Sequence, residues 1–169
     1  MAFLCLFMAL STAALAEPLP KEQLYQKLEL GQRGLSKKAF DLALRGFDKL
    51  LAHGKLMNSA VLSIVDFSLP STQKRLFVIN MITQELIFFD YVAHGKNSGA
   101  TIAKSFSNTI NSLKSSLGFF VTQNTYTGRN GLSLALDGKE KGRNDHALER
   151  SIVIHGAPYV NENFAAQKN

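Results

Sequence analysis

The sequence predicts a mainly β protein with helices at its N-terminus, an α+β fold. Apolar residues recur at spacings of three and four between positions 36 and 51, which is the period of a helix. From residue 60 onward, short runs of β-branched and aromatic residues alternate with glycine-rich polar loops, a pattern typical of strands. A net charge of +6 and a hydrophobic content of 46% over 169 residues are ordinary for one globular domain.

The first 16 residues have the pattern of a secretory signal peptide. They contain no Lys, Arg, Asp or Glu, are mostly apolar, and end in the A-x-A cleavage pattern Ala14-Leu15-Ala16. The alternative is an uncleaved anchor, although the apolar run is short for the roughly 20 residues of a spanning helix. We therefore expect export to the periplasm or cell-wall space, with cleavage before Glu17 and no stable membrane span. The only cysteine, Cys5, would leave with the signal peptide, so the mature chain would have no thiol and no disulfide.

Residues 17–54 are predicted to form an N-terminal helical segment. A short helix is expected at Lys21–Leu30, and a longer one from an N-cap at Ser36 to about Leu51, with His53-Gly54 as its end. The longer helix carries one apolar stripe, which predicts a face docked on the rest of the protein. The stripe consists of Phe40, Ala43, Leu44, Phe47 and Leu51.

Residues 55–169 are predicted to form a β-rich domain. A first strand is expected at Val61–Phe67, followed by an antiparallel hairpin of Arg75–Met81 and Glu85–Ala93. Both hairpin strands are apolar on both faces, which indicates a place in the middle of a covered sheet. The remaining expected elements are strands at Leu117–Thr122, Leu132–Leu136 and Ile152–Ile154, a turn at Tyr126–Gly131, a helical turn at Asp145–Arg150, and a loop with a short helical piece at Tyr159–Asn169.

His155 is the residue that the local pattern proposes for catalysis. It follows directly on the apolar run Ile152–Ile154 and precedes Gly156. A rigid strand would fix the imidazole ring while the loop admits a substrate, as a general base requires. Gly156 has no Cβ, so backbone or substrate could approach closely. The alternative is that His155, like many histidines at strand ends, is only a hydrogen-bonded structural residue.

Several familiar kinds of site are absent from the sequence. Neither a P-loop pattern nor G-x-G-x-x-G occurs, no G-x-S-x-G elbow is present, and the histidines lack H-E-x-x-H spacing. We therefore expect no cofactor and no metal. The charge of +6 favours anionic surfaces such as cell-wall polymers or lipid headgroups. The basic residues are scattered and do not interleave with aromatics, so nucleic acid is not an expected partner.

Four parts of the sequence, taken in order, resemble one family. They are the hairpin from Arg75-Leu76-Phe77-Val78 through Tyr91-Val92-Ala93-His94-Gly95, the blocks Phe106-Ser107-Asn108 and Ser115-Ser116-Leu117-Gly118-Phe119-Phe120, the strand region Tyr126-Thr127-Gly128 with Gly131-Leu132-Ser133-Leu134, and the segment Arg150-Ser151-Ile152-Val153-Ile154-His155-Gly156-Ala157. From about Ser36 to its last residue, the chain resembles the murein L,D-transpeptidase catalytic-domain family, the YkuD-like group. Ser116 stands where proline is usual in that family, which fits a divergent branch.

The resemblance implies a β-sandwich-like catalytic domain over residues 55–169, a wall-facing location, and acyl transfer on peptidoglycan peptide stems. In the family reaction a cysteine thiolate attacks a stem carbonyl next to D-alanine, and a histidine holds the thiolate–imidazolium pair. His155 would then be the general base, with Gly156 opening the pocket beside it. The residues considered as substrate contacts are His94, Ser115, Ser116 and Arg150. Each of these four could instead be structural, Arg150 through a surface salt bridge.

The family's cysteine lies in a serine-x-glycine-cysteine segment downstream of the His-Gly strand, and this sequence reaches Asn169 without one. We therefore expect a chain truncated at its C-terminus, without its nucleophile. The alternative is a non-catalytic exported peptidoglycan-binding module. The reading frame past codon 169 separates the two. The sequence does not indicate an oligomeric state.

Overall fold

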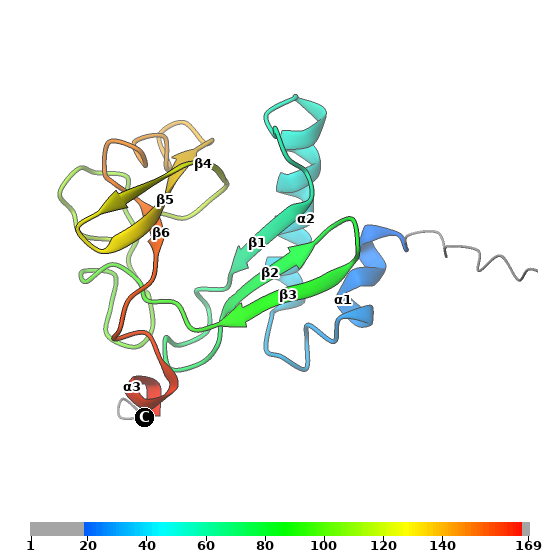
Figure 1. The fold of residues 1–169 in the computed structure, drawn as a ribbon, viewed down its shortest axis with the longest axis horizontal. Coiled ribbons are helices and arrows are strands. Elements are labelled where there is room, and N and C mark those ends of the chain that lie inside the picture. Colours follow the sequence, from blue (N-terminus) through cyan, green and yellow to red (C-terminus); the bar gives the residue numbers. More distant parts are fainter. Residues whose placement is uncertain (1–18, 167–169) are drawn as a thin grey trace, which may run out of the picture.

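The computed structural model describes residues 19–166, so the predicted signal peptide lies outside the described residues (Figure 1). Two N-terminal helical pieces and a longer helix precede two antiparallel sheets, which confirms the prediction of a mainly β fold with N-terminal helices. The elements in order are η1 (Lys21–Gln23), α1 (Leu24–Lys27), α2 (Lys37–Ala52), β1 (Val61–Val65), β2 (Leu76–Asn80), β3 (Glu85–Asp90), β4 (Phe120–Gly128), β5 (Gly131–Gly138), β6 (Val153–His155) and α3 (Glu162–Ala166).

Helix α2 begins and ends where the sequence predicted. The Ser36 hydroxyl accepts a hydrogen bond from the Ala39 N–H at 3.2 Å, which satisfies a free donor of the first turn. Gly54 follows the helix with a φ of 62°, a left-handed conformation that glycine adopts without strain. The expectation that Leu51 docks is wrong, because its side chain is 42% exposed. The last turn of α2 projects beyond the sheet that the helix covers (Figure 1).

The first sheet has the strand order β1-β2-β3 and packs one face against α2 and the N-terminal helical pieces. Phe77 and Ile79 of β2 are fully buried there, and the Phe77 ring lies 4.8 Å from that of Phe89. Burial of this much apolar surface is the main stabilising contribution to such a unit. The core of the sheet and helices consists of Leu24, Leu30, Leu35, Phe40, Leu44, Ile64, Phe77 and Ile79.

Strand β3 differs from its predicted place in the middle of a covered sheet. In the part of the chain that the structure describes, it pairs with β2 alone and therefore forms an edge of the first sheet. The pairing register shifts between Val78 and Ile79, so that Ile87 is left without a partner across the ladder. Ile87 and Phe88 are each 51% exposed. Their apolar character indicated burial, but the bulge and the open face leave them at the surface.

The second sheet has the strand order β4-β5-β6 and holds the segment that ends in His155. Strand β4 continues to Gly128, so the predicted turn shrinks to Arg129 and Asn130. The region before β6 that was predicted as a helical turn consists of hydrogen-bonded turns, in one of which the Arg150 N–H donates to the His146 carbonyl at 2.9 Å. Strand β6 runs from Val153, one residue later than predicted, and includes His155.

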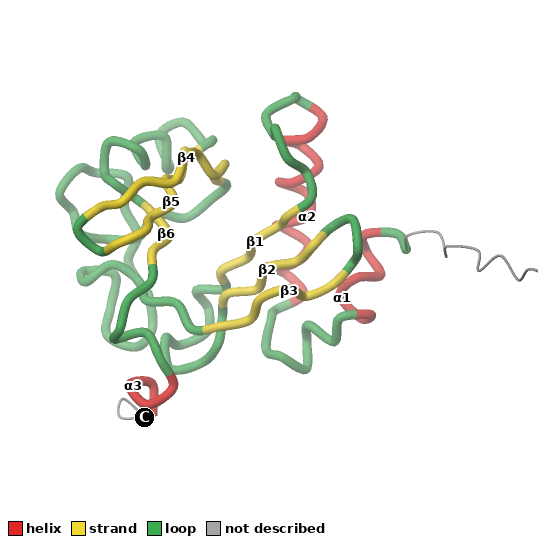
Figure 2. The backbone as a smooth tube through the Cα atoms, in the orientation of Figure 1, coloured by secondary structure: helices red, strands yellow, loops and turns green. Residues whose placement is uncertain are grey.

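Long loops join the two sheets, which lie at separate ends of the molecule (Figure 2). The link to α2 is an aromatic side chain: a Cβ on Gly46 would lie 2.0 Å from the Phe119 ring, so the absence of a side chain at Gly46 lets that ring reach the helix. Phe119 comes just before β4, and its N–H donates to a Glu140 carboxylate oxygen at 2.8 Å. The start of the second sheet is thus anchored on the helix of the first.

Asp66 ties the start of α2 to the end of β1. Its buried carboxylate accepts hydrogen bonds from the backbone N–H groups of Ser36 and Ser68, both at 3.0 Å, and from the Ser68 hydroxyl at 2.6 Å. Burial raises the pKa of Asp66, but these bonds to its ionised form outweigh burial and leave the pKa below the ordinary 3.8.

Asp66→Asn should make the free energy of unfolding fall less steeply as the pH drops. Because the pKa of Asp66 is lower folded than unfolded, its ionised form stabilises the fold above the unfolded pKa, and that contribution disappears as the pH falls through the folded pKa. Urea unfolding at pH 7, 4 and 3 should show a steeper decline for the wild type than for Asp66→Asn. Glu22→Gln, which neutralises an exposed carboxylate, should keep the wild-type slope. An Asp66→Asn protein with the full acid-side decline would contradict this role.

Candidate functional site

His155 is the last residue of β6 and is half-buried. Its Nδ1 lies 2.8 Å from the Gly156 carbonyl oxygen. A carbonyl only accepts, so this contact requires the ring proton on Nδ1. Nε2 then presents its lone pair, which accepts a long 3.5 Å contact from the Asn130 side-chain N–H. The arrangement is that of an imidazole able to take up a proton at Nε2.

The elements around His155 fix the ring and leave one side open. His155 pairs with Ser133 of β5, whose buried hydroxyl donates to the Gly131 carbonyl at 3.1 Å. Asn130 comes from the two-residue turn between β4 and β5. A Cβ built on Gly156 would meet nothing within 4 Å. Open space therefore adjoins Gly156, the residue that follows the histidine where the strand ends.

Arg150, five residues before His155, holds a loop of the chain in place. Its Nη1 donates to the Ser107 carbonyl and to the Ser116 hydroxyl at 2.5 Å, and its Nη2 donates to the Ser112 hydroxyl at 3.0 Å and the Lys114 carbonyl at 2.6 Å. Burial lowers the pKa of Arg150. Its Nε is buried without a hydrogen-bond partner. The guanidinium is therefore occupied by the loop and not by a salt bridge.

Ser115 and Ser116 continue this network toward His94. The Ser115 hydroxyl accepts from the Gly95 N–H at 2.9 Å, and the buried Ser116 hydroxyl donates to the Ser107 carbonyl at 2.9 Å. A Cβ on Gly95 would lie 2.6 Å from the Leu113 carbonyl oxygen, so the two loops approach backbone to backbone. One hydrogen-bonded path thus runs from the loop after β3 to the residues that lead into β6.

His94 is fixed from both sides of its ring. The guanidinium of fully buried Arg75 donates from Nη2 to His94 Nδ1 at 2.8 Å, and His94 Nε2 lies 3.2 Å from the Gly99 carbonyl oxygen. An arginine only donates and a carbonyl only accepts, so the ring carries its proton on Nε2. Neither nitrogen is left to accept a proton, in contrast to His155.

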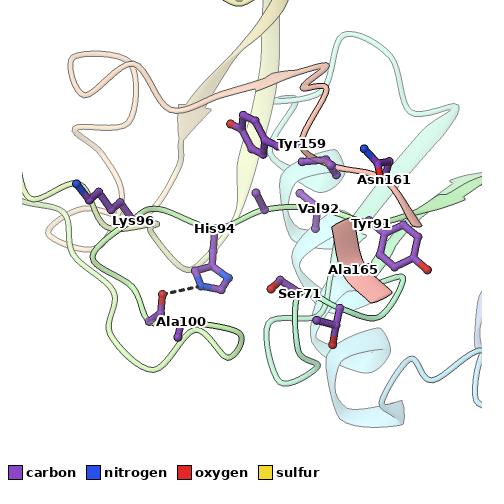
Figure 3. Close-up of a pocket in the computed structure, with 13 residues that line it drawn as sticks. Ser71, Tyr91, Val92, His94, Lys96, Ala100, Tyr159, Asn161 and Ala165 are labelled. Atoms are coloured by element: carbon purple, nitrogen blue, oxygen red, sulfur yellow. Dashed lines mark hydrogen bonds between the residues drawn. The ribbon is translucent and has the colours of Figure 1, made fainter. Parts of the chain in front are cut away.

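A cavity of about 220 Å³ lies against His94 (Figure 3). Its walls come from three stretches of the chain: the residues after β3, the loop at Ser71 and Thr72, and the segment after His155. Tyr159 lies above His94 in the view, and Ala165 of α3 lies to the right of His94. None of the described residues that line the cavity is acidic. His155 is not among the lining residues, so the cavity and the candidate base are separate features.

A family model described as the L,D-transpeptidase catalytic domain matches residues 31–169. The chain belongs to this family. The match begins before α2 and runs through both sheets, and it agrees with the resemblance carried by the His-Gly and Ser-Ser-Leu-Gly stretches. Comparison with curated proteins and with solved structures found no match.

Membership of the L,D-transpeptidase family implies acyl transfer on peptidoglycan, and the family is typically associated with the cell wall. No helix within residues 19–166 combines the length and apolar character that a membrane crossing needs. In the same part of the chain, no three His, Cys, Asp or Glu side chains gather into a group that could hold a metal ion.

The six residues singled out in the sequence fall into two groups in this L,D-transpeptidase domain. His155 and Gly156 stand together at the end of β6. The other four lie in the loops, where Arg150 donates to Ser116 and Ser115 accepts from the N–H of Gly95, the residue after His94. Sequence reasoning missed Asn130, which faces His155, and Arg75, which faces His94. The contact of Asn130 depends on a turn whose length was predicted wrongly. Arg75 had one available signal, a cation that directly precedes the apolar run of β2.

Proposed function

We propose that the chain acts as an exported, peptidoglycan-modifying L,D-transpeptidase in which His155 is the general base for a cysteine nucleophile. The observation that carries the proposal is the Nδ1 contact to the Gly156 carbonyl at 2.8 Å, which leaves the Nε2 lone pair as the proton acceptor, with a long 3.5 Å contact from the Asn130 side chain beside it. The family match supplies the reaction class. The charge of +6 favours an anionic wall as the site of action.

The proposed reaction moves one proton and one acyl group. The thiol gives its proton to His155 Nε2, and the thiolate attacks the carbonyl between the L-centre and D-alanine of a peptide stem. The tetrahedral intermediate collapses when D-alanine leaves and its nitrogen takes the proton from the imidazolium. The remaining thioester is attacked by an amine of another stem or by water, again with Nε2 as the base.

The thiol itself is proposed to come from a serine-x-glycine-cysteine segment that follows residue 169. Cys5 is the only cysteine in the sequence and belongs to the predicted signal peptide. The hydrogen bond of Nδ1 to the carbonyl of Gly156 supports a role for Nε2 toward a group arriving from the open side. Backbone N–H groups near that cysteine would stabilise the oxyanion.

The other four residues are proposed to act as supports for this site. Arg150 and Ser116 share a hydrogen bond at 2.5 Å, and Ser115 binds the N–H of Gly95 next to His94. Polar atoms that already bind one another are poorly placed to hold a substrate. We propose that the network positions the segment leading into β6, and that the cavity at His94 is where any direct contact of His94 with a stem would occur.

A non-catalytic peptidoglycan-binding module is the second candidate. It is favoured by the absence of any thiol in residues 19–166. A stop codon directly after codon 169 would support it over the enzyme.

Intact mass after carbapenem treatment tests the enzyme proposal. A chain extended through the next cysteine of its reading frame should gain the mass of one carbapenem and release D-alanine from a tetrapeptide stem. The mature chain ending at Asn169 should do neither, because the members of such a catalytic unit act together. The extended chain with that cysteine changed to serine is the matched control and should also stay unmodified. Covalent modification of the shorter chain would replace the cysteine mechanism by a serine nucleophile.

A further inference from the structure

Strand β6 is the outer strand of the second sheet. Among residues 19–166, the order β4-β5-β6 places β5 on one side of it and no strand on the other. Backbone groups on the outer side of an edge strand are free to pair with another extended chain. The question is which residues of β6 present those groups.

The hydrogen-bond pattern of the β5–β6 ladder shows which residues of β6 have outward-facing backbone groups. The Leu136 N–H donates to the Ile152 carbonyl at 3.1 Å, so these residues form a hydrogen-bonded pair of the antiparallel ladder. Such pairs alternate with pairs that do not exchange bonds. With Leu134 opposite Ile154 and Ser133 opposite His155, Ile154 bonds inward to β5. The N–H and C=O groups of Val153 and His155 therefore point away from the sheet.

The surroundings of this edge are open. Within the described part of the chain, no hydrogen bond occupies the backbone N–H or C=O of Val153 or His155. Ile154 is 41% exposed, and a side chain at Gly156 would meet nothing within 4 Å. The two outward-facing residues lie about 6.8 Å apart, the repeat of an extended peptide.

We propose that an extended peptide stem binds as a fourth strand along β6, through main-chain hydrogen bonds to Val153 and His155. The inference rests on the proposed function for the identity of the peptide. Strand addition obtains its binding from backbone pairing, which suits a short stem with small side chains. A stem with free carboxylates also complements a chain of charge +6. Pairing at His155 would hold the bond to be broken beside the imidazole that takes the proton.

Amide hydrogen exchange followed by NMR tests this on the mature chain as it stands. Without peptide, the Ile154 amide should exchange slowly and the Val153 and His155 amides quickly. A tetrapeptide stem ending in a diamino acid and D-alanine should slow exchange at Val153 and His155 by tenfold or more and leave Ile154 unchanged. The same stem N-methylated at its D-alanine amide loses a donor and should bind about fivefold more weakly.

Proline variants give a matched pair in the protein. Val153→Pro removes only an outward N–H, which edge strands tolerate, so the protein should fold and bind the stem about fivefold more weakly. Ile154→Pro removes a ladder donor and should unfold at lower urea concentration. Equal stem affinity for wild type and Val153→Pro would overturn the proposal.

Two further outcomes would also overturn it, and neither depends on catalysis. Slow exchange at Val153 and His155 without peptide, or dimers that form through this edge, would show that another part of the chain or a second copy covers β6. If carbapenem acylates the extended chain but the stem does not slow amide exchange at Val153 and His155, the proposed function stands and the strand addition is rejected. If the stem slows amide exchange at Val153 and His155 but carbapenem does not acylate the extended chain, the strand addition stands and the proposed mechanism is rejected.

Discussion

His155→Ala in the chain extended through its cysteine is expected to slow carbapenem acylation by about 10²- to 10⁴-fold, the range for loss of a general base. The substitution removes the Nε2 acceptor, and a thiol without that acceptor stays mostly protonated at neutral pH. His155 is half-buried at a strand end, so the fold should survive the change. The measurement is the rate of mass gain by intact mass spectrometry, with circular dichroism to verify folding.

Two other variants serve as controls for the His155 experiment. His146→Ala changes an exposed histidine in the turns before β6 and should leave the rate as in the unmodified extended chain. Asn130→Ala removes the 3.5 Å contact to Nε2 and should change the rate only severalfold, because that contact is long. Full activity in His155→Ala would move the base elsewhere. His94 would be a poor substitute, because Arg75 and Gly99 occupy both of its ring nitrogens.

The helical part of the fold was predictable because its signals are local. An N-cap at Ser36, a stripe of period 3.6, and a glycine after the last turn lie within 19 residues, and the structure confirms the cap and the end of the helix. Leu51 fits the stripe equally well but is exposed, since burial depends on where the sheet ends. The length of a neighbouring element cannot be deduced from a helix's own pattern.

The strands were found in order, but their neighbours were not predictable. The apolar pattern of β3 predicts a central strand, yet β3 forms an edge, because among the described strands it pairs with β2 alone. Ile87 in addition bulges out of the register with β2. The hairpin turn after β4 was placed too early, since polar and threonine-rich residues such as Thr125 and Thr127 also suit an exposed strand. Pairing partners decide these points, and they lie far apart in the sequence.

The candidate base was indicated by an apolar run ending in a histidine and glycine, but its geometry was not. The nitrogen of His155 that carries the proton follows from its contacts with the Gly156 carbonyl and with Asn130 in the turn between β4 and β5. The role of Arg150 also changed with the structure, because its hydrogen-bond partners lie 34 to 43 residues earlier in the chain. Contacts of such separation leave no periodic signal.

Arg75→Met is expected to destabilise the fold by about 3–5 kcal/mol, the cost of breaking a buried charged network by removing one member. Arg75 is fully buried and donates to the carbonyls of Leu69 at 2.7 Å and Val92 at 2.9 Å, and to His94 Nδ1. Methionine has a similar length but no donor, so these partly buried acceptors would lose their partner, and an unsatisfied buried acceptor costs about 1–3 kcal/mol. The loss is a large share of the roughly 5–15 kcal/mol that stabilises a typical domain.

The cost of desolvating the charge of Arg75 opposes the stabilisation from its hydrogen bonds, so the sign of the change in stability tests the argument. Burial lowers the pKa of Arg75 to about 10, while the charge of Asp66 acts to raise it, so the buried guanidinium remains ionised at neutral pH at a cost in desolvation. If that cost exceeded the value of the hydrogen bonds, Arg75→Met would stabilise the protein. Urea unfolding at pH 7 should instead show a lower midpoint with an unchanged slope. Arg75→Lys keeps a charge and part of the donors, so its urea midpoint should fall between those of the wild type and Arg75→Met. An equal or higher midpoint for Arg75→Met would mean that Arg75 is retained for the orientation of His94 and not for stability.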